Sequence, residues 1–329
     1  MKTLLNKDRH ITRLLVIMAI VLAAMAVLNP SVFYSASNFS SMAVQFPELG
    51  FLSIAAALVL MSGGIDLSIT GTAVFSGIVA ARIMLASDSP DGPSVMVVVL
   101  ACAAALLVGL ACGAVNAVLV AKVGIAPMLV TLGTMNLFTG IGIVLTKGSA
   151  LSGFPASFLA IGSGRLLGIP VPLLLFVLAT IILAFFLNKT KLGYKLCIYG
   201  SNPVASFFSA INNTKVVFTT YVMSGLISSI AGIIMVSRVN TAKADFGSSY
   251  GLQALLVAVL GGVDPSGGSG KAAGIFIAIV TLQFLSSGFN LLHVSSFLKD
   301  LTWGALLVFV MVLNVVNAQS KGKKSGKKE

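Results

Sequence analysis

The sequence predicts an all-α, polytopic membrane protein. Of its 329 residues, 57% are hydrophobic and only 9% are charged, and the mean hydropathy is +1.04. A soluble domain carries about 25% charged residues, so a surface this poor in charge indicates burial in lipid. Several apolar runs reach the roughly 18 to 20 residues that cross a bilayer. None alternates in polarity as the strands of a membrane β-barrel do.

Ten apolar runs follow one another along the chain, and we expect about ten transmembrane helices in a single domain, residues 12–317. The runs are predicted at about residues 12–28, 42–61, 67–86, 95–121, 125–146, 171–187, 216–236, 251–260, 272–291 and 296–317. The first run follows basic residues as a signal peptide does. It is long and lacks a small-residue cleavage site before Asn29-Pro30, so we interpret it as a retained span.

The position of the charges predicts the orientation. The net charge is +12, and the basic residues lie mainly in residues 1–11, in the tail 318–329 and in the segment 188–215, which contains no acid. Because cytoplasmic loops carry excess Lys and Arg, we expect both termini and this segment in the cytoplasm. The turn 87–93 and the loop 147–170 are then external. Charges confined to ends and loops do not form a nucleic-acid-binding face.

Two spans carry patterns typical of close helix contacts. Gly109 and Gly113 lie four residues apart, and Ala105 and Ala117 extend the same face. This face predicts a close backbone approach, either within one subunit or between two. In the fifth run, polar residues including Thr131 and Asn136 favour either helix–helix hydrogen bonds or a wet pathway.

A first break interrupts the apolar sequence between the second and third runs, where Gly63 and Gly64 precede Asp66. A carboxylate next to hydrocarbon costs at least a few kcal/mol unless it faces water, a partner or a helix end, which makes Asp66 a functional-site hypothesis. The alternative is structural, because an aspartate here can cap the following helix.

A second break repeats this pattern after the eighth run, where Gly261 and Gly262 precede Asp264. Two glycine-interrupted segments in corresponding halves are typical of duplicated transporter folds, although a single short match also arises by chance. Asp264 followed by Pro265 has the form of an N-cap and a first helical residue, which favours a capping role.

The sequence contains no recognisable catalytic, metal-binding or nucleotide-binding motif. Gly270-Lys271 is followed by Ala272 and lacks the upstream glycine of a phosphate-binding loop. The acids and histidines are scattered, and the three cysteines, Cys102, Cys112 and Cys197, have no metal spacing and are interpreted as packing residues. We therefore expect no enzyme activity and no cofactor in this chain. If transport uses ATP, hydrolysis lies on another polypeptide.

Several stretches, taken together, resemble the ribose/xylose-type permeases of bacterial ABC importers. The stretches are Ser62-Gly-Gly-Ile-Asp-Leu-Ser68, Gly113-Ala-Val-Asn116 through Pro127 to Thr131-Leu-Gly-Thr134, Lys191-Leu-Gly193 with Gly200-Ser-Asn202, Ala205 and Ile211, and Leu260-Gly-Gly262 with Gly267-Gly-Ser-Gly-Lys271. They run in the family's order from about residue 50 to 315, so the resemblance covers most of the chain.

This resemblance implies a ten-helix permease of the bacterial inner membrane that imports a monosaccharide such as ribose, or a nucleoside or furanosyl signal molecule. The implied partners are cytoplasmic subunits that bind ATP and Mg, a second permease copy or paralogue, and a periplasmic or lipid-anchored substrate-binding protein. The segment 188–215 would then couple to the ATPase, with a short helix from Val204 to Ile211 docking on it. The coupling residues implied are Gly193, Gly200, Asn202, Ala205 and Ile211, and those of a possible pathway are Asn116, Thr131 and Asn136.

The chain also departs from the family pattern. Ile69-Thr70-Gly71 stands where the family usually has Val-Gly-Ser, and Ser206 and Ala210 replace a customary Ala and Gly. A rival hypothesis is a secondary transporter, in which the broken spans and intramembrane acids form an ion site. That protein would work from an ion gradient and would need no ATPase.

Overall fold

The computed structural model describes residues 9–87 and 94–325, with side chains for residues 10–87 and 94–312, and confirms the all-α fold. Every predicted run corresponds to a helix: α2 (Arg9–Leu28), α4 (Ala36–Met61), α5 (Ile69–Leu85), α6 (Val95–Ala121), α7 (Pro127–Thr146), α9 (Val171–Lys189), α12 (Asn213–Val239), α13 (Tyr250–Leu260), α14 (Ala272–Leu291) and α15 (Ser296–Ser325). Among the described residues, seven helices are long and apolar enough to cross a membrane, and α5 and α13 are shorter. Parts of the predicted N-terminal segment, acidic turn and basic tail lie outside the described residues.

Short elements fill the connections. They are α3 (Pro30–Phe33), α8 (Ala156–Ser163), α10 (Lys191–Ser201), α11 (Pro203–Phe208), and the strands β1 (Leu151–Ser152), β2 (Arg165–Leu166), β3 (Ile169–Pro170) and β4 (Thr241–Ala242). β1 pairs with β4 and β2 with β3, both antiparallel. The expected loop 147–170 therefore contains a helix, because α8 packs on α12, where Ser237 Oγ accepts a 2.7 Å hydrogen bond from Gly162 N.

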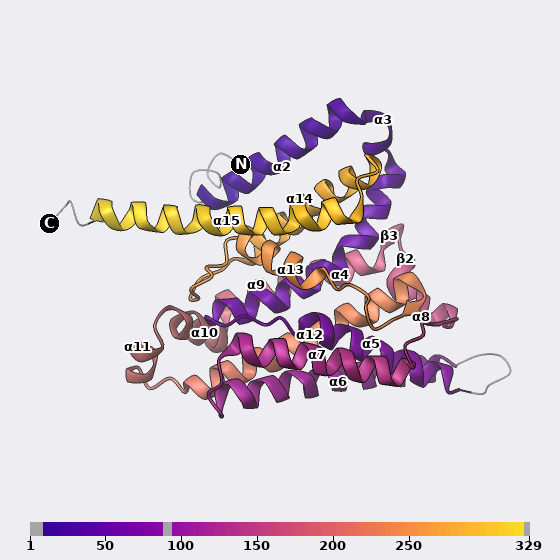
Figure 1. Cartoon of the computed structure of the whole chain (residues 1–329), viewed down its shortest axis with the longest axis horizontal. Helices are drawn as coiled ribbons and strands as arrows, with labels where there is room; N and C mark the ends of the chain where they lie inside the picture. Colours follow the sequence, from indigo (N-terminus) through magenta and orange to yellow (C-terminus); the bar gives the residue numbers. More distant parts are fainter. Residues whose placement is uncertain (1–8, 88–93, 326–329) are drawn as a thin grey trace.

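Helix α4 lies in the middle of the molecule (Figure 1), between a layer of α2, α14 and α15 and a layer of α5, α6, α7 and α12. The start of α2, the end of α15, α10 and α11 lie at one end of the bundle, and α3 and α8 lie at the other. The two ends of the described chain are therefore on the same side as the basic segment 188–215. This arrangement is the one that an even number of spans requires.

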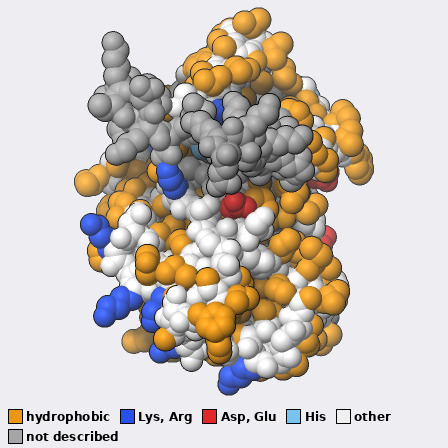
Figure 2. Space-filling view, turned by 90° about the vertical axis from the view of Figure 1, so that its left-hand side faces the viewer, with side chains coloured by type: hydrophobic (Ala, Val, Ile, Leu, Met, Phe, Trp, Pro, Cys, Tyr) orange, Lys and Arg blue, Asp and Glu red, His pale blue; other side chains and the backbone are white. Residues whose placement is uncertain are grey.

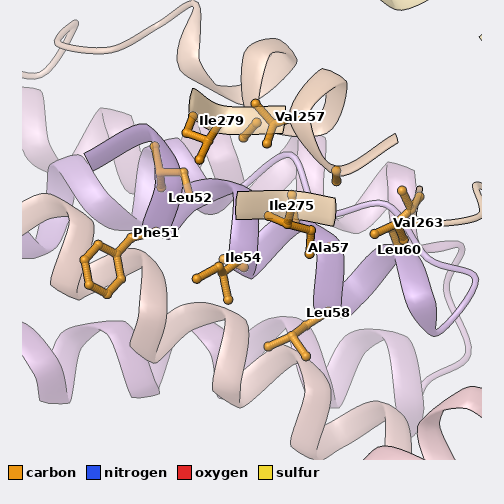
Figure 3. Close-up of a cluster of buried hydrophobic side chains, with 14 of the residues drawn as sticks. Phe51, Leu52, Ile54, Ala57, Leu58, Leu60, Val257, Val263, Ile275 and Ile279 are labelled. Carbon is orange, nitrogen blue, oxygen red and sulfur yellow. The ribbon is translucent and has the colours of Figure 1, made fainter. Parts of the chain in front are cut away.

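The main core surrounds the second half of α4. Leu52 and Leu60 are fully buried, and they pack towards α13 and α14, where Val257 and Ile279 are also fully buried (Figure 3). Lipid is as apolar as these side chains, so close packing rather than the hydrophobic effect holds such helices together. The run Ala55–Ala57 keeps α4 thin enough for helices to pack around it on several sides.

The small-residue face of α6 packs against α12 of the same chain. A Cβ at Gly109 would lie 2.5 Å from the carbonyl oxygen of Gly225, and one at Gly113 would lie 2.5 Å from that of Tyr221. Ala105 and Ala117 are fully buried on the same face. The predicted close approach is confirmed, and of the two alternatives it is the one within a single subunit.

Candidate functional site

The first break, residues 62–68, joins α4 to α5 and contacts α7 and α12. Gly63 has a φ of +78°, a left-handed conformation that glycine adopts without strain. A Cβ at Gly64 would lie 2.8 Å from the hydroxyl of Tyr221 in α12. Thr131 of α7 donates a 3.1 Å hydrogen bond to a main-chain carbonyl of the break. The two glycines therefore permit both the turn and its close packing.

Asp66 is the centre of a buried polar cluster that connects the break to α6 and α12. Its Oδ1 accepts hydrogen bonds from the amide and the hydroxyl of Ser68, at 2.9 and 2.6 Å, and its Oδ2 accepts one from the hydroxyl of Ser224, at 2.8 Å. Asn116 of α6 donates to the Ser68 hydroxyl at 2.7 Å. A buried carboxylate without a cation depends on such donors. These bonds fix the break relative to two other helices.

The second break, residues 261–271, joins α13 to α14 through consecutive turns. A Cβ at Gly261 would lie 2.8 Å from the main chain of α14, and Gly262 has a left-handed φ of +86°. Asp264 Oδ1 accepts a 2.9 Å hydrogen bond from Ser266 N. This aspartate stabilises a turn inside the loop.

The expected capping role of the two aspartates is wrong. Helix α5 begins with Ser68 as its N-cap, and α14 begins with Lys271 as its N-cap. Each aspartate lies further upstream and accepts from the amide two residues later, which is the geometry of an Asx turn. The two positions also differ in setting, because Asp66 is buried and Asp264 is exposed. Whether the breaks arose by duplication stays a prediction.

The two breaks and the end of α10 meet in one place, here called the glycine junction: Gly63, Gly200, Gly267 and Gly268 around the carbonyl of Met61. Gly268 N donates a 2.8 Å hydrogen bond to Met61 O. A Cβ at Gly200 would overlap that same oxygen, and one at Gly267 would lie 2.8 Å from both Gly200 O and Gly63 N. Main chain therefore meets main chain across three segments: α10 lies against the end of α4 and the second break, and the second break lies against Gly63 of the first.

The segment 188–215 consists of two helices rather than one loop. Thr190 caps α10 by accepting a 3.1 Å hydrogen bond from Gly193 N, and a Cβ at Gly193 would overlap the main chain of α9. Asn202 caps α11 by accepting 3.0 Å hydrogen bonds from Val204 N and Ala205 N. Gly193 and Gly200 thus allow α10 to pack closely, while Asn202 begins α11.

The helix expected from Val204 to Ile211 is shorter in the structure, because α11 ends at Phe208. Ala210 has a φ of +57°, which ends the helix, and Ile211 turns back so that its amide donates to Ser206 O at 3.2 Å. Ile211 is buried, whereas Ala205 is exposed. Only Ala205 of these two lies on the free surface of α11.

This end of the molecule presents apolar side chains among basic ones. Phe207 and Phe208 of α11 are 69% and 82% exposed. Figure 2 shows hydrophobic side chains on this end with Lys and Arg side chains around them. Burial raises the pKa of Tyr199 in α10 above its ordinary value. An exposed aromatic pair on a six-residue helix is typical of a surface that another protein covers.

The three possible pathway residues do not come together. Asn116 and Thr131 are buried and both bind the first break region, so the structure uses them in packing. Asn136 is exposed on α7, and its amide donates to Leu132 O at 3.1 Å. Thr131 therefore bonds to the first break rather than to another helix, and a role of these residues in a pathway stays a prediction.

Sequence reasoning missed a second polar cluster, formed by Glu48 of α4, Arg238 of α12 and Tyr250 of α13. Glu48 is 1% exposed and pairs with Arg238 through two hydrogen bonds, of 2.9 and 3.0 Å. The signal was present, since Glu48 is an acid inside an apolar run. Within the described side chains, no group of three His, Cys, Asp or Glu residues is placed to hold a metal ion.

Comparison with known proteins identifies the relatives of this chain. A sequence model of the family described as "Branched-chain amino acid transport system / permease component" matches residues 38–311. The ribose import permease protein of Bacillus subtilis (strain 168) is 34% identical over 297 residues, which cover 90% of this chain and 89% of that protein. The ribose import permease protein of Escherichia coli (strain K12) is 33% identical over 317 residues, or 95% of each chain.

A relative with another substrate in its name is nearly as similar. The autoinducer 2 import system permease protein of Photorhabdus temperata is 30% identical over 270 residues, which cover 80% of this chain and 79% of that protein. No solved structure matches the chain.

Proposed function

The chain belongs to the family of permease components of binding-protein-dependent transport systems, and on that premise we propose that it imports a monosaccharide such as ribose or a related sugar. It is a multi-pass protein of the bacterial inner membrane and a transport subunit rather than an enzyme. The observation that supports a sugar as the substrate is the similarity to ribose import permeases over 90% or more of the chain. The similarity to an autoinducer 2 permease favours a furanosyl signal molecule as the second candidate.

Import of this kind requires partners. We assign ATP and Mg to two cytoplasmic ATP-binding subunits, and substrate delivery to a periplasmic or lipid-anchored binding protein. A second copy or paralogue of the permease completes the pathway. The exposed face of α11, with Ala205, Phe207 and Phe208, is the surface that we assign to the ATP-binding subunit. On this proposal, this end of the molecule and both termini lie in the cytoplasm.

The glycine junction supports a mechanism of coupling. ATP binding moves the subunit under α11, and α10 follows because Asn202 joins the two helices directly. Gly200 then carries the displacement to the end of α4, directly before the first break, and to the second break, since it lies against the main chain of Met61 and of Gly268. The breaks lead into α4, α5, α13 and α14, so a single contact can change the arrangement of four helices. Packed helices respond by switching between arrangements rather than by continuous deformation, which gives alternating access.

Reconstitution tests this function. The chain would be purified with the products of neighbouring genes and placed in liposomes, and uptake of labelled D-ribose would be measured with and without internal ATP and the binding protein. Uptake that requires both is expected. Uptake by this chain alone under a proton or sodium gradient would establish the secondary-transporter alternative instead.

A further inference from the structure

A polar cavity lies between α4, α12, α13, α14 and α15. Its volume is about 80 Å³, several times the roughly 10–15 Å³ that one water molecule needs. Its polar lining includes Gln45, Glu48, Arg238, Gln253 and Gln283, and its apolar lining includes Trp303. Glu48 lies twelve residues into α4, or about 18 Å along a helix that is long and apolar enough to cross a membrane. Polar groups within such a helix are costly and mark functional sites by default.

The charges in the cavity cancel one another. The Arg238 guanidinium donates two hydrogen bonds to the Glu48 carboxylate, from Nε to Oε2 at 3.0 Å and from a terminal nitrogen to Oε1 at 2.9 Å. The Tyr250 hydroxyl donates to the same Oε1 at 2.6 Å. A fork-to-fork pair of this kind satisfies both ions. No uncompensated charge is left in the cavity lining for an ionic ligand.

The carboxamides and one hydroxyl retain free hydrogen-bonding capacity. Among the glutamines that line the cavity, all of them described, the one hydrogen bond runs from Gln283 to Gln45 and is 3.5 Å long. In the described part of the chain, the side chains of Gln253 and Ser286 bond to no protein atom, although both line the cavity. A carboxamide offers donors and acceptors together, as a hydroxyl does. Such groups match a ligand that carries several hydroxyls.

We propose that this cavity binds a neutral polyhydroxylated molecule, a sugar, during its passage through the permease. The inference rests on the proposed function and assigns a site to it. The three glutamines and Ser286 bond to the sugar hydroxyls, and the Trp303 ring packs against the apolar face of the ring. A free amino acid does not fit this chemistry, because its ammonium and carboxylate groups would each need an unpaired partner, and Glu48 and Arg238 are paired with each other.

The cavity is connected to the glycine junction by two helices. Along α4, Glu48 lies thirteen residues before Met61, or about 20 Å. Along α13, Tyr250 begins the helix and the second break follows Leu260. Between the two, Leu52 of α4 points towards Val257 of α13 and Ile279 of α14 (Figure 3). A movement of the junction therefore reaches the cavity walls through these packed helices.

Trp303 provides a direct test, because it is the only tryptophan of the chain and it lines the cavity. The full-length permease, without partners or ATP, would be titrated in lipid nanodiscs while Trp303 emission is recorded. The probes are D-ribose, D-glucose, xylitol, tetrahydrofuran as a ring without hydroxyls, and L-leucine as a zwitterion. We expect a saturable change in emission with at least one of the three polyhydroxylated probes, and none with tetrahydrofuran or L-leucine.

Two variants assign the response to the cavity. Gln253→Leu and Gln283→Leu should each weaken the apparent affinity at least tenfold, whereas Asn188→Leu removes an exposed carboxamide at the end of α9 and should change nothing. Monodispersity and thermal unfolding in the nanodisc would establish that the variants are folded. If a glutamine variant fails to fold, Ser286→Ala takes its place.

Three outcomes would overturn the site: no saturable response to any polyhydroxylated probe, an equal response to L-leucine, or an unchanged response in the folded glutamine variants. None of them bears on ATP-driven import, which is measured with the complete importer. Conversely, failure of ATP-driven uptake with an intact emission response would reject the importer and leave the binding site.

Discussion

The glycine junction and the polar cavity lie about 20 Å apart along α4, and they differ in what makes their contacts: main chain in the junction, polar side chains in the cavity. The junction contains almost no side chains: Gly63, Gly200, Gly267 and Gly268 let main chain meet main chain. The cavity consists of long polar side chains around the Glu48–Arg238 pair. The junction should therefore be sensitive to added volume and indifferent to charge, and the cavity should be sensitive to charge and hydrogen bonding.

Breaking the ion pair of the cavity should have the largest effect on stability. Arg238→Met leaves the buried Glu48 carboxylate without its cation, which costs about 3–5 kcal/mol for a buried pair. The double variant Glu48→Gln/Arg238→Met removes both charges and should recover much of that loss. Thermal unfolding in detergent of the wild type, both single variants and the double variant measures the coupling. A double variant as unstable as the sum of the singles would contradict a paired, neutral cavity.

Substitution of the two aspartates of the breaks should cost different amounts of stability, because Asp66 is buried and Asp264 is exposed. Asp66→Asn keeps one acceptor oxygen but exchanges the other for an NH₂ group facing the Ser224 hydroxyl, and a disturbed buried hydrogen bond costs about 1–3 kcal/mol. Asp264→Asn disturbs only an exposed turn and should cost less than about 0.5 kcal/mol. Uptake should survive in both variants. A stably inserted Asp66→Asn protein that has lost all transport would instead favour a role for the charge.

A bulky residue on α11 should impair coupling without affecting stability. Ala205 is exposed, so the larger side chain of Ala205→Trp can extend into solvent and should leave the unfolding temperature unchanged. It should disturb the contact with the ATP-binding subunit and lower uptake several-fold. Uptake and ATP hydrolysis in the reconstituted importer provide the measurement, and normal uptake would argue against docking at α11.

The exposed ion pair beyond α12 should have the smallest effect. The hydrogen bond from Lys243, 2.8 Å long, lowers the pKa of Asp245 below its ordinary value. Both side chains are at least half exposed, so Lys243→Gln should cost no more than about 0.5 kcal/mol. A lowered pKa stabilises above the unfolded-state pKa, and this contribution disappears as pH falls through the folded value. Variant and wild type should thus converge in acid, and a constant difference in unfolding temperature across that range would contradict the pair.

The sequence predicted the features that depend on local pattern. The apolar runs became helices because run length and hydropathy are local properties, and the face of Gly109 and Gly113 found a partner because small residues permit close approach. Helix α8 was missed because its eight residues lie among Gly, Ser and Pro and are held by contacts with α12. Helix α10 was interpreted as part of a basic loop because its lysines indicate a solvent-exposed segment, whereas it packs closely on α9 through Gly193.

The candidate site was predicted only in pieces. Gly63, Gly200 and Gly267 each stood out or lay in a recognised motif, yet no sequence spacing indicates that three segments meet at one carbonyl oxygen. The same limit applies to Glu48 and Arg238, which are 190 residues apart in sequence. An acid inside an apolar run predicts that a partner exists, but only the packing of α4 against α12 identifies it.

The amount of sugar imported per ATP hydrolysed, compared between Gly200→Val and Gly140→Val, tests most directly whether α10 drives the breaks. Gly140 has open space where a side chain would go, whereas a side chain at Gly200 overlaps the Met61 carbonyl. In the reconstituted importer, Gly200→Val should insert normally and hydrolyse ATP while uptake per ATP falls at least tenfold, and Gly140→Val should match the wild type. Unchanged uptake per ATP in Gly200→Val would contradict transmission through the glycine junction.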